Sequence, residues 1–156
     1  MVSLKERLLK VWNRNPMVFT TLLTIIVLFY PIGLVHELGH YLVGLNSGSS
    51  CEVYWWLETH CEPAPQPSWL YFVLGGIFGM IASSFLFISK KVRSNKGIFV
   101  GVSTTTLDHV LKAIFETHYH SAYLYNFVFG MLTSSLVILF MFALLVFFTK
   151  RTKSKT

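Results

Sequence analysis

The chain has 156 residues, 53% of them apolar and only 13% charged, with a formal net charge of +6. Soluble domains carry about 25% charged residues, so this composition argues against a soluble protein and favours a single membrane domain over residues 1–156. The basic residues form three groups beside apolar stretches, without a nucleic-acid-binding motif around them. We therefore expect the lipid bilayer, and no nucleic acid, as a partner.

Four apolar stretches approach or exceed the roughly 20 residues that a membrane helix needs. They cover residues 17–45, 68–89, 98–116 and 123–149. Because unpaired backbone groups are not tolerated in hydrocarbon, the sequence predicts an all-α integral membrane protein with about four transmembrane helices. Lys and Arg cluster before the first stretch, between the second and third, and after the fourth. The positive-inside rule then places the N- and C-termini in the cytoplasm of a multi-pass cell-membrane protein.

The first stretch contains VHELGHYLVG, in which His36, Glu37 and His40 occupy positions where ionisable groups are costly. Residues four apart share one face of a helix, so the two imidazoles can bind one zinc ion. HExxH on a helix is typical of zinc metalloproteases, where the glutamate acts as general base. We interpret the histidines as zinc ligands and Glu37 as catalytic. Pro31 and Gly33, just upstream, favour a kink or break in the helix.

The loop over residues 46–67 begins and ends with turn signals, and its Val-Tyr-Trp-Trp run favours a short β-hairpin or an interfacial aromatic belt. Cys51 and Cys61, the two cysteines of the chain, both lie in this loop. On an extracytoplasmic face they are expected to form a disulfide. Two free thiols, or a metal site that also includes His60, are the alternatives.

The second stretch carries Gly75, Gly79 and Ser83 at four-residue steps, a pattern that lets another helix approach closely. The third is the most polar of the four. Helical spacing places Asp108 and Lys112 near one face, either as a self-neutralising ion pair or facing a water-filled cavity.

A third zinc ligand is needed beside the two histidines, and Asp108 is the favoured candidate because it lies within a predicted span on a separate helix. Its weakness is depth, since counting the helical rise places it well below His36. The alternatives nearer the outer face are Glu116, His118 and His120. His109 and Lys112 are candidates for an oxyanion site or a water path.

The segments VHELGHYLVG and TLDHVL resemble the site-2 protease family of intramembrane zinc metalloproteases. That family places HExxH on one membrane helix and a metal-binding aspartate, in a Leu-Asp-Gly setting, on a later one. The resemblance implies Zn²⁺ held by His36, His40 and Asp108, with Glu37 as the catalytic residue. It covers residues 31–45 and, more weakly, 104–111. His109 stands where the family has glycine, and STTT replaces the family's upstream asparagine–proline element.

The resemblance implies a zinc metalloendopeptidase that cleaves peptide bonds in or near membrane-spanning segments, with a single-span membrane protein as substrate. One alternative is a non-catalytic membrane protein that binds metal or acts as an accessory factor, which has no need of Glu37. Another is a structural four-helix protein, which predicts no bound zinc.

Overall fold

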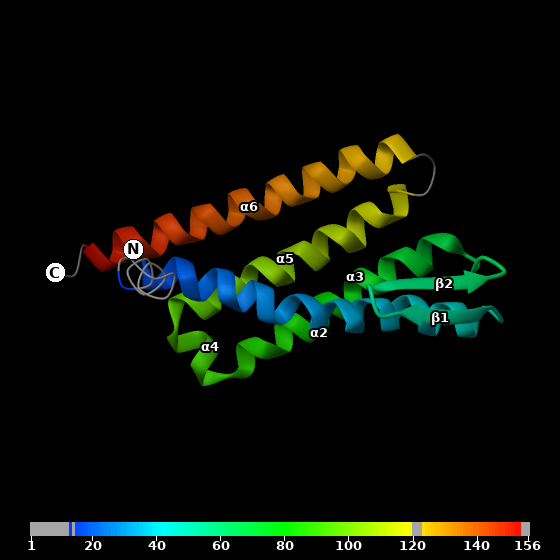
Figure 1. Ribbon diagram of the computed structural model, residues 1–156, viewed down its shortest axis with the longest axis horizontal. Coiled ribbons are helices and arrows are strands. Elements are labelled where there is room, and N and C mark those ends of the chain that lie inside the picture. Colours follow the sequence, from blue (N-terminus) through cyan, green and yellow to red (C-terminus); the bar gives the residue numbers. More distant parts are fainter. Residues whose placement is uncertain (1–12, 14, 120–122, 154–156) are drawn as a thin grey trace, which may run out of the picture.

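The computed structural model describes residues 13, 15–119 and 123–153 (Figure 1). Its long helices are α2 (Pro16–Asn46), α3 (Ser68–Phe85), α5 (Lys96–Tyr119) and α6 (Tyr123–Lys153). A hairpin of β1 (Ser50–Tyr54) and β2 (Glu58–Glu62) follows α2, while η1 (Leu86–Ile88) and α4 (Lys90–Ser94) connect α3 to α5. Within this described part, four helical segments are long and apolar enough to cross a membrane, as predicted: Pro16–Asn46, Ser68–Ile88, Lys96–Glu116 and Met131–Thr149.

The outward faces of the helices are apolar. Ile26 is 70% exposed, Phe29 66% and Leu139 65%. A helix of a water-soluble domain places polar residues on its exposed face, so these faces are instead suited to contact with lipid.

Helix α2 continues through Pro31 without interruption, so the break considered from the sequence does not occur. Proline removes one backbone hydrogen bond, which long apolar helices tolerate when neighbouring helices pack against them. Pro16 begins the helix, where its missing N–H costs nothing. As a result, the whole HELGH segment belongs to one helix with the rest of α2.

Helices α2 and α5 run in the same direction (Figure 1), and small residues set their alignment. A Cβ on Gly97 would lie 2.7 Å from Cβ of Thr20, and one on Gly101 would lie 2.6 Å from Cβ of Thr24. The hydroxyl of Thr21 also donates a hydrogen bond to the Gly97 carbonyl over 3.1 Å. The first turns of the two helices are therefore level with each other.

Helix α3 packs against both α2 and α5 through the predicted small-residue face. A Cβ on Gly75 would meet the His40 ring, one on Gly76 the Ala113 backbone, and one on Gly79 the His109 ring. Conversely, a Cβ on Gly39 of α2 would lie 2.6 Å from the Leu74 carbonyl oxygen. The packing role of this face is thus confirmed.

The β-hairpin folds back along α2, as the loop sequence allowed. Its strands are antiparallel with Cys51 opposite Cys61, and the two cysteines form a disulfide. Leu57, with a φ of 66°, closes the turn and lies against Gly33, while both sulfur atoms lie against Gly44. Glycine at these positions of α2 lets the hairpin approach the helix that carries the HExxH motif.

Candidate metal centre

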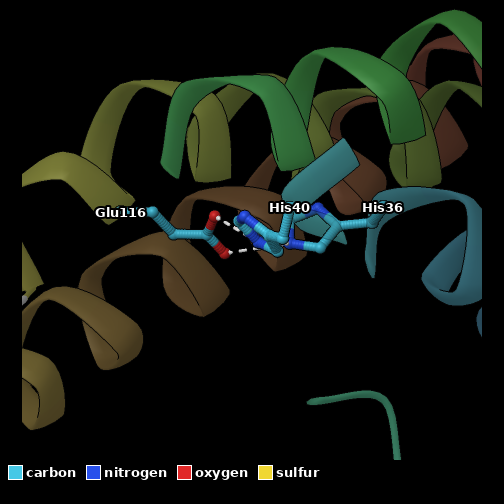
Figure 2. A group of neighbouring side chains, drawn as sticks. All are labelled: His36, His40 and Glu116. Atoms are coloured by element: carbon cyan, nitrogen blue, oxygen red, sulfur yellow. Dashed lines mark hydrogen bonds and ion pairs between the residues drawn. The ribbon is translucent and has the colours of Figure 1, made fainter. Parts of the chain in front are cut away.

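His36 and His40 of α2 and Glu116 of α5 point toward one another and bring three donor atoms together (Figure 2). The two Nε2 atoms lie 3.0 Å apart. Glu116 approaches from α5, with Oε1 at 3.3 Å from His36 Nε2 and Oε2 at 3.7 Å from His40 Nε2. Both histidines are buried. All three ligand atoms lie within 4.8 Å of one another, a grouping that could hold a metal ion.

Tyr71 of α3 fixes the His40 ring. Its backbone carbonyl lies 2.7 Å from His40 Nδ1, and its own ring stacks on the imidazole at a centroid distance of 4.6 Å. A carbonyl can only accept, so in the neutral ring Nδ1 carries the proton and Nε2 turns its lone pair toward the cluster. Metal-binding histidines are commonly oriented in this way.

Asp108, the favoured third ligand, does not join this group. Its Oδ2 pairs with Lys112 Nζ at 3.1 Å, the self-neutralising arrangement considered from the sequence. The parallel alignment of α2 and α5 is the physical reason: Asp108 lies just over two helical turns, about 12 Å, before Glu116. Glu116, one of the alternatives, reaches the histidines instead.

The remaining alternative ligands are not part of the cluster as described. His118 lies in α5, but its side chain is outside the described part of the structure, and His120 is outside the described residues altogether. His60, on β2, is exposed and pairs with Glu62 at 3.2 Å.

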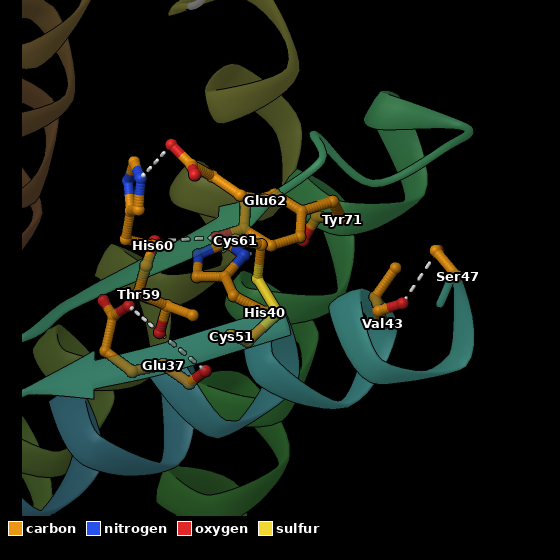
Figure 3. Close-up of a disulfide and its surroundings, with 10 residues drawn as sticks. All are labelled: Glu37, His40, Val43, Ser47, Cys51, Thr59, His60, Cys61, Glu62 and Tyr71. Carbon is orange, nitrogen blue, oxygen red and sulfur yellow. Dashed lines mark hydrogen bonds and ion pairs between the residues drawn. A yellow bond between two sulfur atoms is a disulfide. The ribbon is translucent and has the colours of Figure 1, made fainter. Parts of the chain in front are cut away.

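Glu37 lies next to the cluster and is held by the hairpin. It is buried, with Oε1 at 4.0 Å from His36 Nε2. Its Oε2 accepts a hydrogen bond of 2.8 Å from the Thr59 hydroxyl of β2 (Figure 3). A carboxylate in this position can exchange a proton with a molecule bound beside the histidines.

A cavity of about 490 Å³ connects these groups. The polar part of its lining includes His36, Glu37, Asp108, His109, Lys112 and Glu116. Its apolar part includes Ile25, Phe29 and Val137. The lining of the cavity therefore combines polar groups of the cluster with apolar side chains that suit contact with hydrophobic groups.

His109 brings a further imidazole to the same cavity. It is 4% exposed, and its ring centroid lies 5.3 Å from that of His36. Its Nδ1 is buried without a hydrogen-bond partner, in contact with the space that Gly79 leaves free. A buried lone pair costs less than a buried unpaired N–H, which favours the tautomer with its proton on Nε2.

The chemistry of this donor set fits a zinc ion. Two imidazole nitrogens and a glutamate oxygen form one of the three-ligand sets of catalytic zinc sites, in which a fourth position stays open. Glu116 Oε2 is buried without a hydrogen-bond partner, as expected of an oxygen that lacks a cation.

Thr59 and Tyr71 were not identified from the sequence. Neither lies in a recognisable motif, and their contacts depend on the folded-back hairpin and on the glycine face of α3. The predicted hairpin was the one sequence feature that indicated a structural element near the HExxH helix.

No protein-family model matches this sequence, and neither a curated protein nor a solved structure matches it.

Proposed function

We propose that the protein is an intramembrane zinc metalloprotease that hydrolyses peptide bonds in or near membrane-spanning segments of other proteins. The observation that carries the proposal is the position of Glu37, a buried carboxylate beside a buried His–His–Glu cluster on an apolar helix. A site that only binds metal has no need of this second carboxylate.

His36, His40 and Glu116 would hold the metal ion. Zinc in such a site polarises a carbonyl group and lowers the pKa of a bound water toward about 7. Tyr71 supports this role because it fixes which nitrogen of His40 faces the cluster. Helix α5 supports it by providing a carboxylate, which would offset part of the charge of a divalent cation.

Glu37 would act as general base and then as general acid. It would take the proton of the attacking water and return it to the nitrogen of the leaving amine. His109 lines the same cavity, and an Nε2 proton there could donate a hydrogen bond to the substrate carbonyl oxygen as negative charge develops.

The cavity supports a membrane-embedded substrate. Apolar side chains of α2 and α6 form part of its lining, together with polar residues of α2 and α5. Peptide bonds within an intact helix are shielded, so the substrate segment would have to unwind locally before the cluster. Asp108 and Lys112, which line this cavity and are partly exposed, would keep the cavity hydrated along α5 and allow water to reach the cluster.

We further propose a place in the cell membrane with both termini in the cytoplasm. The three basic groups flank the spans on one side, in agreement with the positive-inside rule. The Cys51–Cys61 disulfide on the other side suits an oxidising, extracytoplasmic compartment.

The deciding experiment compares wild type, Glu37→Gln and His36→Ala in proteoliposomes that contain single-span membrane peptides. We expect wild type to bind about one zinc and cleave, Glu37→Gln to keep the zinc and lose cleavage, and His36→Ala to lose both. Undiminished cleavage by Glu37→Gln would refute the role of Glu37. Bound zinc without cleavage by wild type would favour the non-catalytic metal-binding protein.

A further inference from the structure

A chain of contacts joins the proposed general base to one of the metal ligands through residues outside the HExxH motif. The Thr59 hydroxyl lies 2.8 Å from Glu37 Oε2 and 3.2 Å from the Glu37 carbonyl oxygen. The Thr59 carbonyl accepts a hydrogen bond of 2.9 Å from the Tyr71 hydroxyl. The Tyr71 carbonyl in turn lies 2.7 Å from His40 Nδ1. Figure 3 shows these residues beside the disulfide.

The first contact matters because of what a general base must do. A glutamate side chain has three rotatable bonds, and a proton acceptor must stay within about 3 Å of the proton that it removes. Thr59 binds Oε2 and leaves Oε1 on the side of His36, at 4.0 Å from Nε2. One carboxylate oxygen is thus held, and the other faces the cluster.

The hairpin itself is anchored at three places, so Thr59 has little freedom. The Tyr71 hydroxyl binds the Thr59 backbone, the sulfur atoms of the Cys51–Cys61 disulfide lie against Gly44 of α2, and Leu57 lies against Gly33. These anchors hold β2 against α2 at the level of the HExxH motif.

We propose that Thr59 is a positioning residue for Glu37 and that Tyr71 fixes Thr59 in this role, so the hairpin is part of the catalytic machinery. The proposal rests on the protease function proposed above. The hydroxyl group of Thr59 carries this role. Substitution by any side chain without a hydrogen-bond donor would remove the contact with Glu37.

The activity test compares Thr59→Val, which is nearly isosteric, with Thr59→Ser, which keeps the hydroxyl. We expect Thr59→Val to lower kcat about tenfold, a loss typical of a hydrogen bond to a charged group, with KM and zinc content unchanged. Thr59→Ser should recover most of the rate. Tyr71→Phe, which keeps the ring and the carbonyl, should lower kcat by a smaller factor. The matched control is His60→Ala, an exposed position on the same strand.

A second measurement needs neither metal nor activity. Thermal unfolding of metal-free protein is followed for wild type, Thr59→Val, Glu37→Leu and the double variant. We expect Thr59→Val to lower Tm by a few degrees in the otherwise wild-type protein and by less in the Glu37→Leu background, because that background lacks the carboxylate acceptor and keeps only the longer contact to the backbone carbonyl of residue 37. Equal shifts in both backgrounds would overturn the contact.

The two levels of the proposal can fail separately. Wild-type cleavage together with full kcat in Thr59→Val, or with no recovery in Thr59→Ser, overturns the positioning role alone. Absence of zinc-dependent cleavage by wild type overturns the protease function and the positioning role together.

Discussion

Glu116 Oε1 lies 3.3 Å from His36 Nε2, although the two residues belong to different helices and only His36 is part of the HExxH motif. The contact exists because α2 and α5 start level, at Pro16 and Lys96, and run in parallel. Each carries its ligand five to six turns further along. The alignment of two helices, and not a local motif, therefore selects the third donor.

The first prediction separates Glu116 from Asp108. Glu116→Gln should weaken zinc binding by more than about 100-fold, since loss of a ligand exceeds the 10–100-fold effect of losing a ligand's supporting partner. Asp108→Asn should retain zinc, because Asp108 binds Lys112. Zinc content after dialysis against a mild chelator measures both. If Asp108→Asn loses the metal and Glu116→Gln keeps it, the third metal ligand is Asp108 and not Glu116.

The second prediction concerns the space beside His40. Gly75→Ala places a methyl group in the His40 ring, which cannot move away easily because Tyr71 holds it. We expect a 10–100-fold loss of zinc affinity, as for other changes that disturb a ligand's orientation. Ser84→Ala, on the exposed side of α3, is the control. Unchanged affinity in Gly75→Ala would mean that His40 is not a ligand in this orientation.

The third prediction concerns the disulfide. The bond closes a loop with a sequence separation of 10 residues, so its removal in Cys51→Ser/Cys61→Ser should destabilise the hairpin by about 2–3 kcal/mol. Differential scanning calorimetry of wild type and the double variant measures this. Addition of a dithiol reductant should lower the stability of wild type and leave the double variant unaffected. Thiol labelling serves to confirm that the disulfide has been reduced. If reduced and untreated wild type then unfold identically, the disulfide does not stabilise the hairpin.

The fourth prediction concerns His109. His109→Leu should lower kcat by about 10²-fold, the lower end of the range for losing one oxyanion donor, while zinc stays bound. His109→Gln keeps an N–H donor and should retain more of the rate. Steady-state kinetics with zinc analysis of the same samples gives both numbers. Equal rates for the Leu and Gln variants would show that the imidazole contributes packing only.

Most of the fold could be predicted from the sequence because long apolar stretches have few alternatives in a membrane. The same holds for the hairpin, where turn residues enclose a β-favouring run with a cysteine on each strand. The sequence alone pointed to His36, Glu37 and His40 as candidate site residues. Their spacing along one helix is a local property, which does not depend on the rest of the fold.

The sequence could not decide which candidate on the later helix joins the two histidines, because the choice depends on the relative height of two helices. Composition places the ends of a span only within a few residues, and an error of one turn displaces a side chain by about 5.4 Å. Glu116 and Asp108 differ by two turns on the same helix, so the choice between them required the contacts of Gly97 and Gly101 with α2. The contact between Thr59 and Glu37 could not be predicted either, because it also depends on the direction in which the hairpin folds.

The parallel pairing of α2 with α5 also bears on how the molecule is made. During synthesis α2 leaves the ribosome well before α5, so in the proposed membrane setting the HExxH residues would enter the bilayer without the Glu116 carboxylate. The hairpin and α3, which come next in the chain, contact Glu37 and His40 and can shield them in the nascent protein. Metal binding by all three donors, as proposed above, would then require α5. Under the proposed function, the order of the elements would keep the incomplete site covered by its own neighbours until Glu116 is in place.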